Sequence, residues 1–229
     1  MKIHGLQKMT LLDYPGRVAC TVFLGGCDMR CPFCHNAELI DGTAAPVMEE
    51  DELLRFLEKR KGLLDGVAFT GGEPTLRKDL PDLFRKVKAM GYPVKLDTNG
   101  MHPDMLRALL AEGLIDYVAM DIKNSPGKYA LTAGLDSLDL GPVLESIEML
   151  KSSSIEYEFR TTVVDELHTA EDFEAIGKMI AGARAYFMQA FTDRDTVVYG
   201  NFHAPTRKCM ESYLSVVQKY VPNSGLRGI

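Results

Sequence analysis

The sequence lacks several features that define large classes of proteins. Its 229 residues include 26 Lys and Arg against 32 Asp and Glu, a formal net charge of −6, so basic residues are not in excess. Because a protein that binds nucleic acid usually presents a basic face, we expect no nucleic-acid partner. The chain also has no run of about 18 apolar residues, which predicts that no helix spans a membrane.

Targeting and repeat signals are missing as well. Residues 1–8 mix polar residues with glycine, and no long apolar segment follows them, so we expect no signal peptide and a cytoplasmic protein. No internal repeat or low-complexity tract is evident. The composition, 46% hydrophobic and 25% charged, is ordinary for a folded domain. We predict one domain over residues 1–229, with an N-terminal lead-in (1–17) and a C-terminal helix and tail (201–229).

Cysteines are few, but three of them lie close together. The chain has 5 cysteines, an odd number, and Cys27, Cys31 and Cys34 fall within one short segment. In a reducing compartment such a group indicates a metal site or redox chemistry rather than a disulfide framework. Cys20 lies in an apolar segment and is interpreted as a packed thiol. We assign no role to Cys209.

Apolar, β-branched segments alternate with segments whose apolar residues recur at helical spacing. The predicted strands are 18–24, 66–70, 94–97, 114–122, 155–164 and 184–190, and the predicted helices are 49–61, 79–90, 103–112, 141–152, 169–181 and 205–220. Thr169 and Asp172 have the spacing of a capping box at the start of one helix. The alternation predicts an α/β fold, a partial (β/α)6 barrel with a parallel sheet and outer helices. Six units are too few for the closed eight-stranded barrel.

The three clustered cysteines have Cys-x3-Cys-x2-Cys spacing and follow the first predicted strand. Thiolates are soft ligands that suit iron–sulfur clusters and zinc. Three thiolates can bind three irons of a cubane and leave the fourth iron open to a small molecule. A structural zinc site normally has four protein ligands, and His35 would be the fourth. A zinc-binding structural protein is therefore an alternative.

Polar residues gather at the ends of the later strands, where parallel α/β folds place their active groups. They are Gly71-Gly72-Glu73-Pro74, Asp97-Thr98-Asn99-Gly100, Asp121 and Lys123. Arg160 lies within the fifth predicted strand. Glycines permit close backbone approach to a ligand, although a plain Gly-Gly turn is the alternative. Asn99-Gly100 also predicts a turn. Arg160 needs a partner within its apolar strand, and a structural salt bridge is the alternative to ligand binding.

These motifs together resemble the radical SAM (S-adenosylmethionine) superfamily, and the resemblance covers nearly the whole chain. The extension Cys34-His35-Asn36 resembles the activating enzymes of glycyl radical enzymes. The same group is indicated by Asp13-Tyr14-Pro15-Gly16, Leu96-Asp97-Thr98-Asn99-Gly100 and Met120-Asp121-Ile122-Lys123. The length, the opening GLQKMTLLDYPG and the ending LRGI are most similar to activating proteins of anaerobic ribonucleoside-triphosphate reductases. Pyruvate formate-lyase activating enzymes are similar in the same motifs.

The resemblance implies a radical SAM oxidoreductase with one 4Fe–4S cluster on Cys27, Cys31 and Cys34. In the family, the amine and carboxylate of SAM chelate the open iron, and reductive cleavage yields methionine and a 5′-deoxyadenosyl radical. That radical then takes a hydrogen atom from a glycine of a partner enzyme. The family expectation for the electron donor is flavodoxin or ferredoxin. No cysteine lies between Cys34 and Gly71, so we predict no additional clusters.

The resemblance also implies a set of SAM-binding residues. They are Phe33, His35, Gly71, Gly72, Glu73, Thr98, Asp121, Lys123 and Arg160. A monovalent cation on Asp97, Thr98 and Asp121, with the carbonyl of Ala119, is a secondary hypothesis, because hard oxygen ligands suit a hard cation. His35 has an alternative role, a hydrogen bond to a cluster sulfur. No side-chain acid or base is assigned, because hydrogen-atom abstraction does not require one.

One departure and three open alternatives remain. Thr192 stands where pyruvate formate-lyase activating enzymes have a histidine near the nucleoside, which weakens that specific assignment. A pyruvate formate-lyase-type activase, a radical SAM enzyme acting on a small molecule or peptide, and the zinc protein stay as alternatives. Asp13 and Arg17, near the cysteines in sequence, are hypothesised to contact the partner's glycine loop or simply to be solvated.

Overall fold

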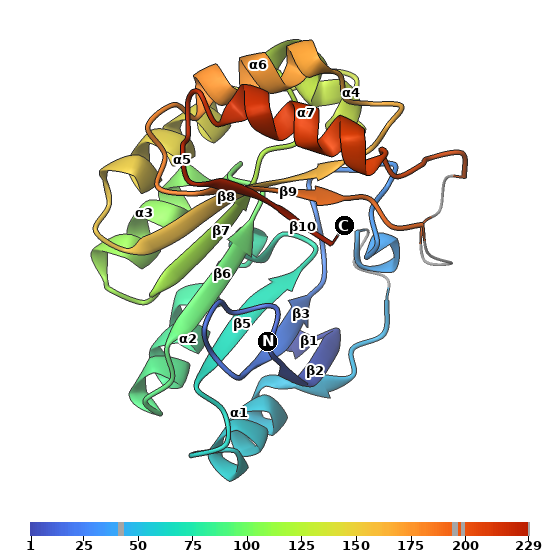
Figure 1. Ribbon diagram of the computed structural model, residues 1–229. Coiled ribbons are helices and arrows are strands. Elements are labelled where there is room, and N and C mark those ends of the chain that lie inside the picture. Colours follow the sequence, from blue (N-terminus) through green and yellow to red (C-terminus); the bar gives the residue numbers. More distant parts are fainter. Residues whose placement is uncertain (41–43, 194–196, 198–199, 229) are drawn as a thin grey trace. The chain divides into compact units, whose positions relative to one another are not determined.

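The computed structural model (Figure 1) describes residues 1–40, 44–193, 197 and 200–228. The contacts within the chain divide it into two compact units. Unit 1 comprises Met1–Asp28, Glu38–Thr98 and His102–Val118. Unit 2 comprises Met29–Ala37, Asn99–Met101 and Ala119–Ile229. Each unit is described by itself, and the single-domain organisation stays a prediction.

Unit 1 is built on strands in the order β2-β3-β5-β6. These are β2 (Gly5–Thr10), β3 (Ala19–Leu24), β5 (Gly66–Gly71) and β6 (Val94–Thr98). Strands β3, β5 and β6 are parallel, and β2 pairs antiparallel with β3. The short strands β1 (Lys2–Ile3) and β4 (Met48–Glu49) form a separate antiparallel pair. Strand β7 (Tyr117–Asp121) begins in this unit and ends in unit 2.

The helices of unit 1 bury one apolar side each. They are α1 (Glu50–Lys59), α2 (Leu80–Ala89) and α3 (Pro103–Ala111), with the 3-10 turns η1 (Ala37–Leu39), which starts in unit 2, and η2 (Pro74–Leu76). Helix α1 begins at a capping box made by Glu49 and Glu52, which satisfies amide groups of its first turn. Phe84 of α2 packs on Phe69 of β5 with ring centroids 4.6 Å apart, so the core of this unit lies between sheet and helices.

Unit 2 continues with strands in the order β7-β8-β9-β10. Strands β8 (Glu156–Val163), β9 (Tyr186–Ala190) and β10 (Ser224–Arg227) are parallel. The helices are α4 (Tyr129–Ala133), α5 (Gly141–Ser152), α6 (Ala170–Met179) and α7 (Arg207–Val217), and the 3-10 turn is η3 (Pro126–Lys128). Helices α6 and α7 pack together, and α7 contacts β9 and β10 (Figure 1).

The fold class is confirmed: the chain has an α/β fold with a mostly parallel sheet. Every predicted strand and helix is present, with ends shifted by a few residues. The predicted capping box of α6 is confirmed, with both reciprocal bonds between Thr169 and Asp172. The sequence interpretation missed β1, β2, β4, β10 and the short helix α4. Among the described residues, no helix combines the length and apolar character needed to cross a bilayer.

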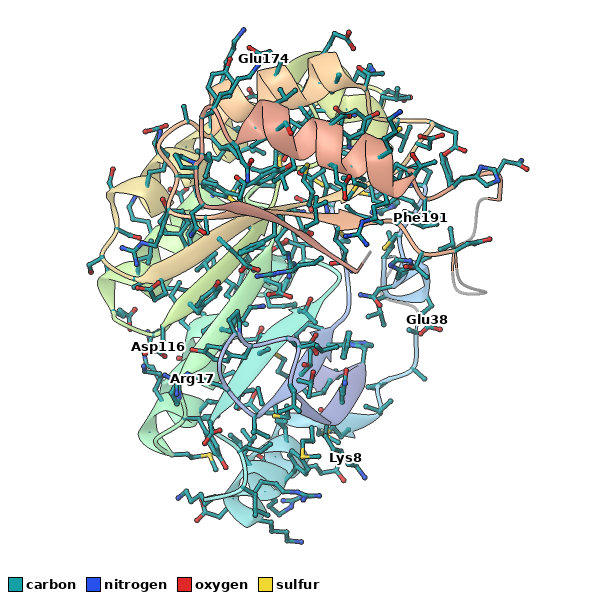
Figure 2. The ribbon with its side chains drawn as sticks, viewed as in Figure 1. Lys8, Arg17, Glu38, Asp116, Glu174 and Phe191 are labelled. Atoms are coloured by element: carbon teal, nitrogen blue, oxygen red, sulfur yellow. The ribbon has the colours of Figure 1, made fainter. Side chains whose placement is uncertain are left out.

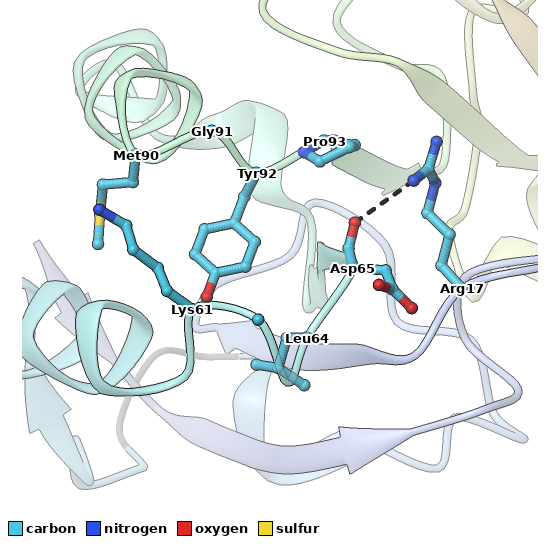
Figure 3. A pocket seen from close by; sticks show the side chains of 9 residues that line it. Arg17, Lys61, Leu64, Asp65, Met90, Gly91, Tyr92 and Pro93 are labelled. Atoms are coloured by element: carbon cyan, nitrogen blue, oxygen red, sulfur yellow. Dashed lines mark hydrogen bonds between the residues drawn. The ribbon is translucent and has the colours of Figure 1, made fainter.

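A cavity of about 380 Å³ lies in unit 1, at the amino ends of β5 and β6 (Figure 3). Arg17 lines it and donates from Nη1 to the carbonyl of Asp65 at 3.4 Å. Because Asp65 precedes β5 while Cys27 follows β3, which is parallel to β5, Arg17 and Cys27 lie at opposite ends of this sheet. Closeness to Cys27 in sequence therefore does not place Arg17 beside it in space, and a contact of Arg17 with the partner's glycine loop stays a hypothesis.

Candidate active site

The Gly-Gly segment after β5 packs directly against the backbone that leads into Cys27. Gly72 donates its N–H to the carbonyl of Leu24 at 2.8 Å, and Glu73 donates to the carbonyl of Gly26 at 2.7 Å. A Cβ on Gly72 would stand 2.0 Å from the Gly26 oxygen, so no other residue fits without moving backbone. The two glycines are thus required for the loop of Glu73 to pair with the segment before the first cysteine.

Glu73 is a buried carboxylate at this strand end, with 1% of its surface exposed. Its Oε1 accepts from the amide of Thr75 at 3.0 Å, from the Thr75 hydroxyl, and from the Thr98 hydroxyl at 2.8 Å. These donors come from η2 and from the end of β6, so two elements orient one carboxylate. Hydrogen bonds of this kind offset the cost of burying a charge. Sequence reasoning missed Thr75, although it stands two residues after Glu73.

Thr75→Val keeps the shape of this side chain but removes its hydroxyl donor. We expect the free energy of unfolding to fall by about 1.5–3 kcal/mol, the usual worth of a hydrogen bond to a charged group. Urea titration followed by circular dichroism measures this change, and Thr75→Ser, which keeps the donor, serves as the control. Equal stability of the valine variant and the wild type would contradict the assigned bond.

Cys27 and its neighbour Asp28 end the first segment of unit 1. The amide of Cys27 donates to the carbonyl of Ile40 at 2.9 Å, which ties the residue to the segment after η1. Asp28 accepts from Nε2 of His102, the residue before α3, at 2.9 Å. This hydrogen bond raises the pKa of His102 above its usual value, although burial opposes the shift. This pair could not be predicted from sequence patterns, because 74 residues separate its members.

Cys31 and Cys34 belong to unit 2, where the segment between them forms a tight turn. The amide of Cys34 donates to the carbonyl of Cys31 at 3.1 Å. Phe33 is buried in an apolar cluster with Val164, Leu167 and Phe191, and Cys31 packs against this cluster. Burial raises the pKa of the Cys31 thiol, and the positive charge of Lys123 opposes that shift. A cationic neighbour of this kind favours the thiolate form, which is the form that binds metal.

His35 is held by the loop after β9. Its Nε2–H donates to the carbonyl of Thr192 at 2.6 Å, and its ring stacks on Phe191 with centroids 5.5 Å apart and an interplanar angle of 4°. Phe191, labelled in Figure 2, also meets Phe33 edge to face at 6.4 Å. The position marked as a departure in the sequence, Thr192, therefore contacts the cysteine loop through its backbone, which any residue type can do.

A carboxylate between two cations follows β7. Asp121 accepts from Nζ of Lys123 at 3.0 Å and from Nε of Arg160 at 2.9 Å. Burial alone would raise the pKa of Asp121, but the charges of Arg160 and Lys123 outweigh it and lower that pKa. Burial alone would lower the pKa of Lys123, but the negative charge of Asp121 outweighs the effect of burial and raises the pKa of Lys123. The expectation that Arg160 has a partner is confirmed. The three side chains carry a net charge of +1, which suits an anionic group of a ligand.

The backbone of Lys123 is positioned by a buried histidine that sequence reasoning missed. His168, 2% exposed, donates from Nε2 to the carbonyl of Lys123 at 2.9 Å, and its Nδ1 accepts from the amide of Val164 at 3.2 Å. Nδ1 also lies 3.2 Å from the carbonyl of Val164, to which only a protonated Nδ1 can donate. Burial lowers the pKa of His168 below its usual 6.5, and the carbonyls of Lys123 and Val164, which favour the charged ring, oppose this only in part.

His168 is expected to make folding sensitive to acid. Because its pKa is lower in the folded state, its contribution to stability is fully present above pH 6.5 and is lost as the pH falls towards the folded pKa. The free energy of unfolding of the wild type should therefore drop between about pH 7.5 and pH 5.5 by more than that of His168→Gln. Urea titrations of both proteins across this range measure the difference. Parallel pH curves would contradict the assignment.

The remaining residues predicted at the site have partners of their own. In unit 1, Asp97 forms an ion pair with Lys95, which is 1% exposed. In unit 2, the Asn99-Gly100 turn is confirmed, since Asn99 Oδ1 accepts from the Met101 amide at 2.9 Å and Gly100 has φ +79°. Outside the site, Cys20 is fully buried in β3, as predicted, and burial raises its pKa to about 12.

Several solved structures have a similar fold. A domain of pyruvate formate-lyase activating enzyme from Bacteroides vulgatus superposes with a TM-score of 0.59 at 13% identity, over 71% of this chain and 99% of that chain. Streptococcus suis SuiB bound to the precursor peptide SuiA gives a TM-score of 0.70 at 15% identity, over 91% of this chain and 48% of that chain. At such low identity these likenesses establish the fold alone.

Sequence comparison is more specific. The radical SAM superfamily model matches residues 21–180. A Methanocaldococcus jannaschii protein, named as a candidate glycyl-radical enzyme activating enzyme, is 32% identical over 235 aligned residues, covering 99% of this chain and 96% of that protein. Pyruvate formate-lyase-activating enzyme of Clostridium pasteurianum is 33% identical over 128 residues, 54% of this chain and 52% of that protein. The chain therefore belongs to the radical SAM superfamily and, within it, to the activating enzymes of glycyl radical enzymes.

Proposed function

We propose that this protein cleaves SAM reductively at one 4Fe–4S cluster and generates a glycyl radical on anaerobic ribonucleoside-triphosphate reductase. The observation that carries the proposal is the match over nearly its whole length to a candidate activating enzyme, with the complete cysteine motif present. Family membership implies both SAM and the cluster. The partner enzyme is inferred from the resemblance of the opening and closing sequence segments.

The residues present fit a 4Fe–4S cluster. Cys27, Cys31 and Cys34 form no disulfide with another described residue, and Lys123 provides a positive charge near Cys31. Among the described residues, no three His, Cys, Asp or Glu side chains converge on a single ion. A cubane does not need such convergence, because each cysteine binds a different iron. When bound, the cluster supplies the electron that breaks the C5′–S bond of SAM.

The chain's own residues bind and orient SAM in this proposal. Lys123 and Arg160, which share Asp121, attract the SAM carboxylate through their net positive charge. Glu73, oriented by Thr75 and Thr98, accepts from the ammonium group. Gly71 and Gly72 bring their backbone close to the ligand, and Phe33 and His35 border it. A monovalent cation on Asp97, Thr98 and Asp121 remains part of the proposal, and it would compete with Lys95 for Asp97.

The reaction on the partner balances as a hydrogen-atom transfer. The 5′-deoxyadenosyl radical takes the hydrogen of a glycine Cα–H bond, giving 5′-deoxyadenosine and a radical on that carbon. Glycine is a favourable target because the flanking amides delocalise the unpaired electron. One electron per turnover comes from flavodoxin or ferredoxin. The chain needs no side-chain acid or base for this step, so its contribution is binding, orientation and exclusion of water.

The test uses protein that has been reconstituted with iron and sulfide without oxygen, then mixed with dithionite, SAM and one partner at a time. We expect a glycyl radical signal in electron paramagnetic resonance with anaerobic ribonucleoside-triphosphate reductase and a much smaller one with pyruvate formate-lyase. The opposite preference would assign the chain to the pyruvate formate-lyase type. Formation of 5′-deoxyadenosine with no radical on either partner would favour a small-molecule or peptide substrate.

A further inference from the structure

The two faces of the β8–β10 sheet in unit 2 are buried to different extents. Side chains of one face, among them Tyr186 and Met188, are fully buried, and α7 contacts β9 and β10 (Figure 1). Along β9 the burial alternates, so Phe187 is half-buried and Gln189 is exposed on the other face. Parallel sheets are normally covered on both faces. A face that is only partly covered and carries polar side chains therefore indicates a surface that can receive a ligand.

On this open face, the strand register aligns residues of β8, β9 and β10 in two rows. One row places Thr162, Gln189 and Arg227 beside one another on β8, β9 and β10. The row below places Arg160, Phe187 and Gly225 together. The open face thus extends from Arg160, at the candidate SAM site, to Arg227 in the LRGI segment. That segment contributed to the family resemblance, yet the proposed chemistry gives it no role.

Arg227 is held rigidly on this face. Its Nη1 and Nη2 donate to the two carboxylate oxygens of Glu158, each at 2.7 Å, and Glu158 is 1% exposed. The guanidinium lies over the ring of Phe187, 3.6 Å from the centroid. Gly225 leaves room for that ring, since a Cβ there would stand 3.3 Å from Phe187 Cε1. A bidentate pair and a stacking contact together orient the guanidinium before any ligand arrives.

The charges divide this face into two parts. The group of Asp121, Lys123 and Arg160 carries a net charge of +1 and suits a carboxylate. Arg227 is neutralised by Glu158, so it offers hydrogen-bond donors without net charge. A guanidinium has five N–H groups, of which Glu158 takes two, and the Arg227 side chain is 37% exposed. Gln189, whose position on β9 pairs with that of Arg227 on β10, has an amide that both donates and accepts. Uncharged donors and acceptors match peptide backbone rather than an anion.

We propose that Gln189 and Arg227 are specificity residues that hydrogen-bond the backbone of the partner's glycine-bearing loop. This inference rests on the proposed function and identifies where that partner is recognised. Glu158 and Phe187 are positioning residues, because their contacts orient the guanidinium of Arg227. The loop lies along the row of Thr162, Gln189 and Arg227, and its glycine Cα points towards the part of the face where Arg160 lies.

Two variants test the proposal. Gln189→Ala removes the amide and leaves the Glu158–Arg227 pair intact. The double variant Glu158→Gln, Arg227→Gln removes the guanidinium without leaving a buried, unpaired carboxylate. The assay is glycyl radical formation on anaerobic ribonucleoside-triphosphate reductase at varied partner concentration, with 5′-deoxyadenosine formed without partner measured in parallel. We expect the KM for the partner to rise about 3- to 10-fold for each variant, the effect of losing about one hydrogen bond.

The matched control is Arg207→Gln, Glu211→Gln, which removes an Arg–Glu pair exposed on α7 of the same unit. It should leave the KM for the partner unchanged. In the test variants, 5′-deoxyadenosine formation without partner should stay within about twofold of the wild type, since a merely structural defect would lower it too. If the double variant does not fold, Gln189→Ala alone decides.

An unchanged KM for Gln189→Ala, in a protein that still forms the glycyl radical, overturns the inference and leaves the proposed function standing. A rise in KM accompanied by an equal loss of 5′-deoxyadenosine formation also overturns it, because the defect would then lie in SAM cleavage. A wild-type protein that makes 5′-deoxyadenosine but no radical on the partner overturns the proposed function, and this inference with it.

Discussion

Replacing Cys31 with alanine should abolish 5′-deoxyadenosine formation, with a loss of more than about 100-fold. A cluster that has lost one of three thiolate ligands is not retained, and no other described cysteine is expected to substitute. Cys20 is buried in β3, and Cys209 lies in α7. The measurement is the product yield after anaerobic reconstitution, with iron content determined on the same sample. Wild-type protein should hold about four irons per chain.

Cys209→Ala is the matched control for this experiment. It removes a partly exposed thiol from α7 of the same unit that contains Cys31 and Cys34. Iron content and product yield should both equal those of the wild type. Wild-type activity in Cys31→Ala would show that this cysteine is not a cluster ligand. Stoichiometric zinc in place of iron, with no 5′-deoxyadenosine, would instead support a structural metal site.

Gly72→Ala should unfold the loop that holds Glu73 and eliminate SAM binding. The added Cβ would stand 2.0 Å from the carbonyl oxygen of Gly26, and neither atom belongs to a flexible side chain. The backbone must therefore separate, which also breaks the bond from the Glu73 amide to Gly26. We expect the free energy of unfolding to fall by about 3 kcal/mol or more. Urea titration and equilibrium dialysis with labelled SAM measure the two effects.

Gly127→Ala separates this clash from the general effect of replacing a glycine. A Cβ at Gly127 would meet no atom within 4 Å, and the residue does not have a positive φ. Its unfolding free energy should change by less than about 1 kcal/mol, and SAM binding should be unaffected. If Gly72→Ala also leaves the unfolding free energy and SAM binding nearly unchanged, the close approach of the two backbone segments is not needed for either.

The order of strands and helices was predictable because the buried parallel strands, such as β3 and β5, are nearly continuous apolar runs, whereas apolar residues of the helices recur at helical spacing. The missed strands lack that signal. Strand β2 (GLQKMT) is an antiparallel edge strand with three exposed residues, and β10 (SGLR) is nowhere fully buried. The opposite error occurred at Leu114 and Ile115, which are buried but precede β7. Apolar residues in a buried connection look the same in sequence as a strand, because burial rather than backbone conformation determines their type.

The residues of the candidate site also fall into those that sequence patterns predict and those that they do not. Motif residues such as Cys31, Glu73 and Lys123 could be predicted because their chemistry is tied to short, dense sequence patterns. The groups that orient them could not. His168 reaches the Lys123 carbonyl across 45 residues, and His35 donates to the backbone of Thr192 across 157 residues. A backbone acceptor imposes no residue type, so such contacts leave no pattern in one sequence.

The pair of Glu158 and Arg227 also affects how unit 2 folds during synthesis on the ribosome. The two residues are 69 positions apart, so a ribosome adding about 5–20 residues per second needs roughly 3–14 s to deliver the guanidinium after the carboxylate. During that interval the bidentate pair with Arg227 is missing, so burying the charged Glu158 in β8 is less favourable than in the complete chain. Completion of the β8–β10 sheet therefore waits for Arg227, and a chain stalled before it should be unusually sensitive to proteases.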